Sequence, residues 1–439
     1  MVVVEPYRAR VVESIKLCSP EERERAIVEA FFNPHLLAAE KVYIDLLSDS
    51  GTGALSAPQL AALVGEDESF AFQSSYSEFV ETVRSIFGFK YVHPIHQGRA
   101  GEHILCNIFV EKGAPVPSNT HYATTRANVE YFGGVPEDFV IQEAYSPQID
   151  HPFKGNIDVE RVKPHVAEGR VLIGFLTITN NSLGSQPVSL ENIRAYKRVM
   201  GEVPLYLDAC RFAENAWFIK KREAGYEDRS VREIVREIFA GVDGCMVSGK
   251  KDGLSHIGGF LATNDQKVAE RIENLILLIE GFHTHGGLTG RDLKVLSLGL
   301  QEVLQEDYLS ARMGQVEYLF ERLRHKEIAV YSPPGGNAVF IDAESFLPHL
   351  SPDDFPGFAL SCEIYRQGGV RVAATGRPGE KAPQLVRMSI PRRVYSNSHL
   401  DYVVDVVGKV HAHRENVRGL RLAWRPPSLF HYVARFTSA

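Results

Sequence analysis

The chain has 439 residues, of which 44% are hydrophobic and 23% are charged, so it is long enough for one large and one smaller domain. Its formal net charge of -7 lacks the basic excess that nucleic-acid binding needs, so no nucleic-acid partner is expected. No apolar run is long enough to span a membrane, and the five scattered cysteines form no paired framework, so we expect a cytoplasmic protein.

The first predicted helix begins after a serine in the segment 19–22 (SPEE), where a proline and a glutamate complete a capping box. We expect this helix to end near Asn33 and the segment 49–53 (DSGTG) to form a tight loop. Residues 1–55 are therefore assigned to an N-terminal arm that joins the smaller domain.

The middle third of the chain alternates between strand-like and helical segments. The run 171–179 (VLIGFLTIT) is continuously apolar, which is typical of a strand covered on both faces. We then expect a helix over 189–200, a strand over 204–207, a helix from about 214 and a strand over 245–247. This βαβαβ order predicts an α/β fold with a mostly parallel sheet in a large domain of residues 56–310.

The last third has a different pattern. Strand-like runs at 339–343 and 385–390 bracket a helix-rich stretch, and 399–410 is expected to be helical. We assign residues 311–439 to a smaller α+β domain.

Polar residues follow three strand-like runs: Asn181, Asp208 and Lys251. Because ligands bind beyond the carboxyl ends of parallel strands, these three ends predict one binding site. Lys251 follows a buried strand, where desolvation lowers an amine pKa and favours imine formation. The alternative is that Lys250 and Lys251 are two solvated surface lysines.

Two further residues allow a chemical and a structural interpretation. Asp208 can pair with the nitrogen of a pyridine-type cofactor, or it can cap the helix that follows it, and spacing alone weighs the two evenly. Arg211 can approach the phenolic oxygen of such a cofactor or pair with a neighbouring carboxylate. The segment 96–102 (HQGRAGE) precedes an amphipathic helix and is either a phosphate cup or an ordinary glycine turn.

Seven blocks resemble the tryptophanase and tyrosine phenol-lyase family in the same order. They are DSGTGA (49–54), HQGR (96–99), TNNSLGSQPVS (179–189), DACRFAENAWFIKKREAGY (208–226), SGKKD (248–252), GGLTGRD (286–292) and VRMSIPRRVYS (386–396). The resemblance implies a fold-type I, aspartate-aminotransferase-like architecture that binds pyridoxal phosphate. It also implies a homodimer or homotetramer with active sites at the subunit interface.

The resemblance assigns roles residue by residue. Lys251 matches the Schiff-base lysine, Asp208 the partner of the pyridine nitrogen, and Arg211 the arginine beside the phenolic oxygen. Tyr122 lies where the family stacks a phenylalanine on the cofactor ring. The phosphate is assigned to Gln97, Gly98, Arg99 and Ser248 with Lys250 nearby, and the substrate carboxylate to Asn181 and Arg387.

The family also uses a monovalent cation, usually potassium, at the subunit interface. The matching positions are Glu68 and the backbone near Gly51 and His256. A plain surface glutamate is the alternative for Glu68.

Several positions depart from the family. Phe70 replaces a tyrosine that protonates the leaving group, and phenylalanine has no proton to give. Thr375 falls near the position at which the phenol-lyases have an arginine that helps to bind the phenol. His431 matches a histidine that the tryptophanases have and the phenol-lyases lack. His35 replaces a pocket phenylalanine and Ala123 a polar residue, which predicts a substrate pocket of different polarity.

The resemblance implies a β-elimination in which a Cβ-substituted L-amino acid gives an aminoacrylate and then pyruvate and ammonia. His431 joins Lys251, Asp208 and Arg211 among the residues expected to take part in catalysis. A second hypothesis is β-substitution, transamination or retro-aldol cleavage on the same scaffold, motivated by Phe70. A third is a binding module without activity, which the retained lysine and arginines disfavour.

Overall fold

The larger lobe is built around a five-stranded sheet with the order β2-β8-β7-β6-β5. In the computed structural model, which describes residues 4–439, four of these strands have only buried residues and β2 is nearly as buried, which fits their mostly apolar sequences. The strands are β2 (Tyr91–Ile95), β5 (Gly174–Thr177), β6 (Leu205–Asp208), β7 (Gly244–Ser248) and β8 (Gly259–Thr263).

The predicted parallel pairing holds for β5, β6 and β7. β8 runs antiparallel to both β7 and β2, so the sheet is mixed. The chain returns from β7 to β8 through a short loop without a helix, and only an antiparallel pairing allows so short a connection. The α/β class is as predicted.

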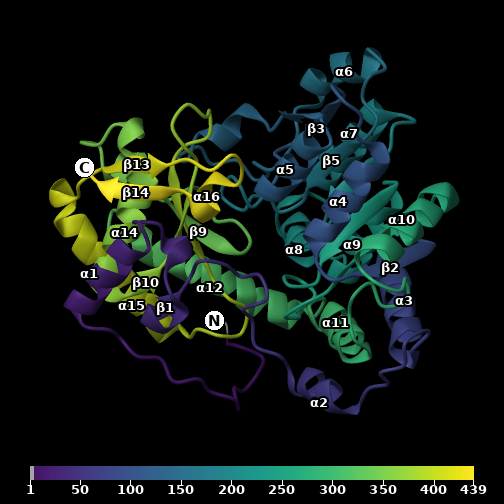
Figure 1. Ribbon diagram of the computed structural model, residues 1–439, viewed down its shortest axis with the longest axis horizontal. Helices are drawn as coiled ribbons and strands as arrows, with labels where there is room; N and C mark the ends of the chain where they lie inside the picture. The colour runs from purple at the N-terminus through teal and green to yellow at the C-terminus, as the bar shows by residue number, and fades with distance from the viewer. Residues whose placement is uncertain (1–3) are drawn as a thin grey trace.

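Helices cover both faces of this sheet (Figure 1). Alternate side chains divide between two apolar clusters: Leu207 and Phe260 point to one face, whereas Tyr206 and Leu261 point to the other. One face is covered by α3 (Ser74–Phe87), α7 (Leu190–Met200), α8 (Phe212–Arg222), α9 (Val231–Ala240) and α11 (Gly290–Glu302), and the other by α4 (Gly98–Phe109) and α10 (Gln266–Ile279).

The smaller lobe holds an antiparallel sheet of β11 (Ala373–Thr375), β12 (Leu385–Ser389) and β9 (Ala338–Asp342). It has its own apolar core, formed with α1 (Pro20–Glu29), α14 (Pro356–Gly368), α15 (Asn397–Ala412) and the end of α12 (Glu306–Arg324). The N-terminal arm joins this lobe because β1 (Ile44–Asp45) pairs with β10 (Val370–Arg371).

The capping box predicted for the first helix is present, with Ser19 and Glu22 bonded reciprocally. The helix ends at Glu29, earlier than the expected end near Asn33. Phe31 and Phe32 have φ of 51° and 52°, a left-handed conformation that no α-helix can contain.

The remaining elements lie at the edges of the two lobes. They are α2 (Ala57–Gly65), α5 (Ala123–Tyr131), α6 (Val159–Ala167), α13 (Ala343–Phe346), α16 (Phe430–Val433), β3 (Pro115–Ser118), β4 (Val135–Asp138), β13 (Leu420–Trp424), β14 (Arg435–Ser438) and the 3-10 turns Pro34–Leu36, Ala39–Lys41, Gln142–Tyr145, Pro352–Asp354 and Arg414–Asn416. β3 and β4 form a parallel pair, whereas β13 and β14 form an antiparallel one.

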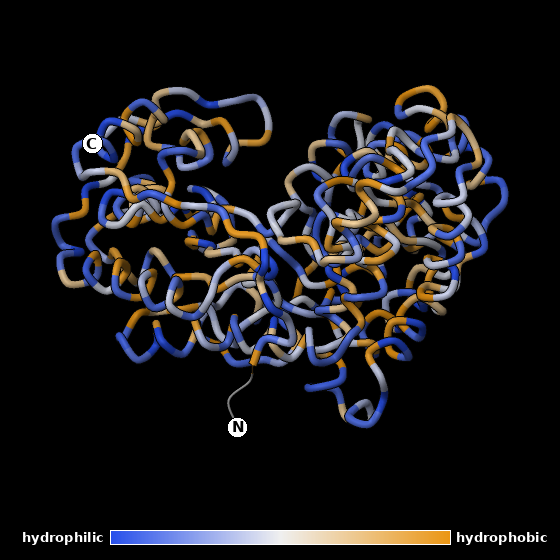
Figure 2. Tube along the Cα trace, turned by 90° about the horizontal axis from the view of Figure 1, so that it is seen from below, coloured by the Kyte–Doolittle hydropathy of each residue, from blue (hydrophilic) through white to orange (hydrophobic). Residues whose placement is uncertain are grey.

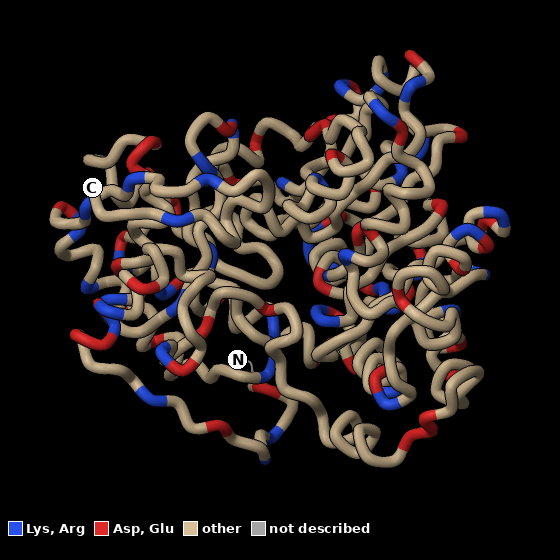
Figure 3. Tube along the Cα trace, in the orientation of Figure 1, with Lys and Arg blue, Asp and Glu red and all other residues tan. Residues whose placement is uncertain are grey.

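Apolar segments run through the interior of both lobes (Figure 2). Acidic and basic residues alternate along the whole trace instead of gathering in one place (Figure 3). Within residues 4–439, no helix combines the length and apolarity that crossing a membrane requires. We propose that the two cores correspond to the predicted domains, residues 56–310 and residues 311–439 with the arm 1–55, whose first three residues lie outside the described part.

Candidate active site

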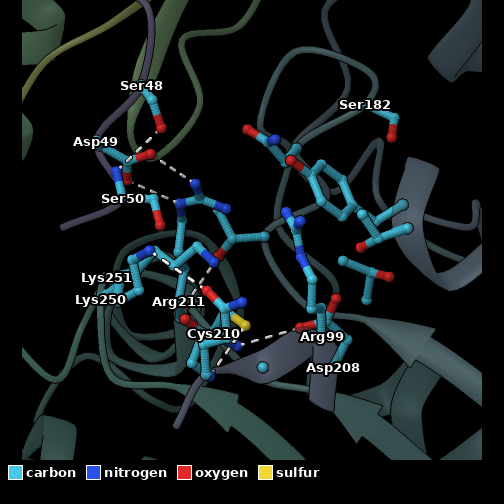
Figure 4. A pocket seen from close by; sticks show the side chains of 18 of the residues that line it. Ser48, Asp49, Ser50, Arg99, Ser182, Asp208, Cys210, Arg211, Lys250 and Lys251 are labelled. Carbon is cyan, nitrogen blue, oxygen red and sulfur yellow. Dashed lines mark hydrogen bonds and ion pairs between the residues drawn. The ribbon is translucent and has the colours of Figure 1, made fainter. Parts of the chain in front are cut away.

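The carboxyl ends of β5, β6 and β7 open onto a cavity of about 250 Å³ (Figure 4). Most of the residues that the sequence singled out line it. They are Gln97, Gly98, Arg99, Tyr122, Asn181, Asp208, Arg211, Ser248, Lys250, Lys251 and Arg387. Three strand ends, one helix start and one strand of the smaller lobe therefore converge on one space.

The loop after β7 directs both lysines to the cavity. The Gly249 N–H donates to the Gly258 carbonyl at 2.8 Å, and the Lys251 N–H donates to the Ser248 carbonyl at 3.4 Å. Burial, Lys251 and Arg99 all lower the pKa of Lys250. The alternative of two solvated surface lysines does not fit this placement, because both side chains line the cavity.

Asp208 lies 7% exposed at the end of β6, where its Oδ1 accepts from the Cys210 N–H at 3.4 Å. It does not cap α8. Asp252 takes that role, since its Oδ2 accepts from the N–H groups of Ala213 and Glu214 at 2.8 and 3.3 Å. Asp208 is thus placed to meet a ligand in the cavity.

The start of α4 forms an anion cradle. Gln97 is the N-cap and makes no side-chain cap, so the first N–H groups of the helix stay available. A Cβ on Gly98 would lie 2.9 Å from the Ser248 Cβ, so only glycine lets this turn approach β7. With Arg99 and Lys250 beside it, the cradle suits a phosphate group.

Arg211 pairs with a carboxylate in this structure. Its Nε and Nη2 donate to the two oxygens of Asp49 at 3.1 and 2.7 Å. Arg392 donates to Asp49, Glu214 and Asp252 at 2.7, 2.8 and 2.8 Å. Burial would raise the pKa of the Asp49 carboxyl, but Arg211 and Arg392 hold it well below its usual value. Arg211 also lines the cavity, so it can contact the phenolic oxygen of a bound cofactor while it is paired with Asp49.

Arg387 enters the cavity from the central strand of the smaller lobe. Its Nη2 donates to the Leu47 carbonyl at 3.2 Å, while its Nε is buried and has no partner within residues 4–439. The Oδ1 of Asn181 is likewise buried without a partner in that range. Unpaired buried groups of this kind are costly unless a ligand satisfies them, which fits a polar substrate group.

Four residues that the sequence predicted to take part in catalysis or to meet the substrate side chain do not line the cavity: His35, Phe70, Thr375 and His431. The His431 Nε2 contacts the Gly376 carbonyl at 3.0 Å, and the Thr375 hydroxyl donates to the Leu385 carbonyl at 3.5 Å. His35 lies edge-on to Tyr432 with the ring centroids 5.2 Å apart. Burial, then Arg387 and His431, lower the pKa of His35 to about 3, so its imidazole is neutral.

Phe70 is 76% exposed and packs on Phe282, with ring centroids 5.3 Å apart. Within this single protomer it is remote from the cavity lining.

The three residues predicted for a monovalent cation form two separate sets of contacts. Glu68 accepts from the Gly290 N–H at 3.1 Å and pairs with Arg291. Gly51, at φ 73°, packs so closely on His256 that a Cβ would lie 3.0 Å from its carbonyl oxygen. Within residues 4–439 no hydrogen bond or ion pair joins Glu68 to either residue, and no cluster of three acidic, histidine or cysteine side chains suits a metal ion.

Three of the cavity residues that the sequence did not predict carry ionisable or hydroxyl groups that matter for the site, namely Asp49, Glu102 and Tyr432. Glu102 lies one turn after Gly98 on the same face of α4, and burial raises its pKa to about 7. Asp49 belongs to a recognised block but was given no role. Tyr432 follows His431, and its place in the cavity depends on the packing of α16, which no local pattern predicts.

The fold is shared with pyridoxal-phosphate enzymes of fold-type I. A serine palmitoyltransferase from Sphingomonas wittichii is 13% identical with a TM-score of 0.62, covering 90% of this chain and 97% of that one. A histidinol-phosphate aminotransferase from Sinorhizobium meliloti is 14% identical with a TM-score of 0.60, covering 91% and 96%. This similarity shows that the chain has the fold-type I architecture that the sequence predicted.

The sequence comparisons assign the chain to one family among the enzymes that share this fold. Residues 45–406 match the family of β-eliminating lyases. Tryptophanases from Hyphomonas neptunium and Salinibacter ruber are 46% and 48% identical, covering 99% and 98% of this chain and 99% and 95% of theirs. A tyrosine phenol-lyase from Intrasporangium calvum is 44% identical and covers 99% and 95%. The chain belongs to the β-eliminating lyase family, which confirms the predicted family and enzyme class.

Proposed function

We propose that this chain is a pyridoxal-phosphate-dependent lyase that eliminates the β-substituent of an L-amino acid and releases pyruvate and ammonia. The observation that carries the proposal is the convergence of Lys251, Asp208 and Arg387 on one cavity. The relatives named tryptophanase are 45–48% identical, whereas those named tyrosine phenol-lyase are 39–44% identical, which favours a tryptophanase-like enzyme.

The residues fit the cofactor. Bound pyridoxal phosphate supplies an electron-withdrawing ring that stabilises negative charge at the Cα of the amino acid. The α4 cradle with Arg99 and Ser248 would hold the phosphate, and Asp208 would keep the pyridine nitrogen protonated. Tyr122 would stack on the ring and Arg211 would lie beside its phenolic oxygen.

The remaining steps belong to side chains of this chain. Arg387 and Asn181 would bind the substrate carboxylate, because the guanidinium fork matches its geometry and the buried Nε lacks a partner. The Nζ of Lys251 would bind the aldehyde and afterwards take up the Cα proton. His431, His35, Thr375 and Phe70 stay predicted contributors to substrate choice, although none of them lines the cavity within residues 4–439.

We also propose a homotetramer with a potassium ion between protomers. The support is that, among the described residues 4–439, no hydrogen bond or ion pair joins Glu68 to Gly51 or His256. A second copy would bring them together and would cover the exposed Phe70. Sedimentation velocity with potassium exchanged for sodium tests both points, and a monomer in potassium would contradict them.

Pyruvate release tests the proposed reaction. Purified protein with pyridoxal phosphate is incubated with L-tryptophan, S-alkylcysteines and L-serine, and lactate dehydrogenase reports pyruvate. At least one substrate should give pyruvate and ammonia in equal amounts. Mass spectrometry of the products distinguishes the alternative, because a keto acid that keeps its side chain shows transamination instead.

A further inference from the structure

Two tyrosine hydroxyls meet at the wall of the cavity. The Oη atoms of Tyr122 and Tyr432 lie 2.6 Å apart, and both residues line the cavity. Tyr122 is the N-cap of α5 in the larger lobe, whereas Tyr432 belongs to α16 in the smaller lobe. The hydrogen bond between them therefore joins the two lobes.

The position of Tyr432 is fixed by the N-terminal arm. The Asn33 side-chain amide donates to the carbonyls of His431 and Ala434 at 3.2 and 2.9 Å, which clamps both ends of the α16 turn. His35 lies against the edge of the Tyr432 ring. A hydroxyl held this firmly can discriminate between ligands, because it cannot move away from an unsuitable group.

The pair lines the same cavity as Arg99 and Arg387, the arginines of the two expected anion sites. Burial raises the pKa of Tyr432, while Arg387 and Arg99 act in the opposite sense. The raised pKa keeps the Tyr432 hydroxyl protonated near pH 7, so it acts as a hydrogen-bonding group. An amino acid bound through Arg387 would extend into the space that both tyrosines line.

Counting the donors and acceptors of the two hydroxyls shows which substrate groups can lie against them. Each hydroxyl has one donor and two acceptor lone pairs, so whichever one donates to the other, the second keeps a free O–H. A hydrocarbon group pressed on the pair would bury that O–H without a partner. An oxygen or nitrogen at the same place would accept from it.

Building on the proposed function, we propose that the Tyr122–Tyr432 pair determines specificity by selecting L-amino acids whose β-substituent ends in a hydrogen-bonding oxygen or nitrogen. A site built to bond a polar group rejects analogues that lack it, because its own buried groups are then left unpaired.

Two matched substrates test the proposal. S-(2-hydroxyethyl)-L-cysteine and S-propyl-L-cysteine each release an alkanethiolate of nearly the same size, and the two thiolates differ in a terminal hydroxyl. We expect kcat/KM to favour the hydroxyethyl substrate about tenfold, as one net hydrogen bond requires. The double variant Tyr122→Phe/Tyr432→Phe, which removes both hydroxyls, should bring this ratio close to one. Tyr131→Phe, an exposed residue of the same α5 helix, should leave it unchanged.

A binding measurement separates this proposal from the proposed reaction. Neither 6-hydroxy-L-norleucine nor L-2-aminoheptanoate carries a leaving group at Cβ, so calorimetry of the cofactor-loaded protein reports recognition alone. The hydroxyl compound should bind about tenfold more tightly, and the double variant Tyr122→Phe/Tyr432→Phe should lose this preference. Equal binding of the two compounds, or a ratio unchanged in the double variant, would overturn the proposal. Tight selective binding without any pyruvate release would instead contradict the proposed elimination.

Discussion

The two walls of the cavity are built in different ways. The cofactor wall comes from strand ends and one helix start of the larger lobe, where regular hydrogen bonding fixes each side chain. The substrate wall combines the arm, β12 and α16, which are distant in the sequence. The resemblance assigns most of the cofactor contacts to the first wall, whereas Arg387 and Tyr432 come from the second. We therefore propose that the first wall sets the chemistry and that the second wall sets the side chain that the enzyme accepts.

The cofactor wall should be the more sensitive to substitution. Lys251→Ala removes the amine that binds the aldehyde and accepts the Cα proton, so turnover should fall on the order of 10⁴-fold or more. The yellow absorbance of the bound cofactor should disappear as well. Lys112→Ala, at an exposed lysine far from the cavity lining, serves as the control and should keep both properties. Unchanged colour and turnover in Lys251→Ala would contradict the assignment of the cofactor wall.

A buried ion network joins the two walls and can be broken separately. Arg392 is 2% exposed and binds Asp49, Glu214 and Asp252 together. Arg392→Met leaves these carboxylates short of a partner, so the free energy of unfolding should fall by about 3–5 kcal/mol. Urea denaturation measures the loss.

A matched variant controls for the loss of one arginine. Arg322 pairs with Asp401 on the surface, with both side chains more than 40% exposed. Arg322→Met should therefore change the free energy of unfolding by about 0–1 kcal/mol. Equal losses in the two variants would show that the network does not stabilise the junction between the walls.

The substrate wall is tested at Arg387. Arg387→Lys keeps the charge but loses the fork, which should reduce kcat/KM roughly 30-fold, mostly through KM, since a hydrogen bond to a charged group contributes about 2 kcal/mol. The decarboxylated analogue S-propylcysteamine controls for indirect effects, because it lacks the carboxylate that Arg387 is expected to bind. Its affinity, measured by calorimetry, should be the same in both proteins. An equal loss for both ligands would remove Arg387 from carboxylate binding.

The same contrast explains how far the sequence could predict the structure. Asp208 and Lys251 come after apolar runs that are typical of buried strands. The end of such a run marks the end of a strand, and it can be read from the sequence without knowledge of the packing. The phosphate cradle needed only a glycine before an amphipathic helix. Strand β8 was not predicted, because its pairing depends on a loop that reverses the chain without a helix.

The substrate wall could not be predicted in the same way. Tyr432 reaches the cavity because Asn33 clamps α16, and this contact joins residues about 400 positions apart. Asp49 could be recognised in a family block, but its pairing with Arg211 and Arg392 requires both lobes to be in place. Local sequence patterns carry no information on such contacts. The sequence therefore predicted the class of reaction, but it did not predict the residues that we propose to select the substrate side chain.

The smallest expected effect sharpens the description of the cofactor wall. Burial raises the pKa of Glu102 to about 7 from an ordinary value of 4.5, with nearby Asp208 acting in the same sense. The folded protein therefore keeps a proton that the unfolded chain releases, so this stabilisation is complete below about pH 4.5 and is lost as the pH rises through 7. The side chain of Glu102→Gln cannot ionise, so this variant should not show the loss of stability that Glu102 causes. Between pH 5 and pH 8, the free energy of unfolding should decrease in both proteins, but the decrease should be about 1–3 kcal/mol smaller in Glu102→Gln. Glu111→Gln, at an exposed residue, should follow the unmodified protein, and Asp252 contributes equally in all three. Parallel stability curves for Glu102→Gln and the unmodified protein would show that the proton on this wall is held elsewhere.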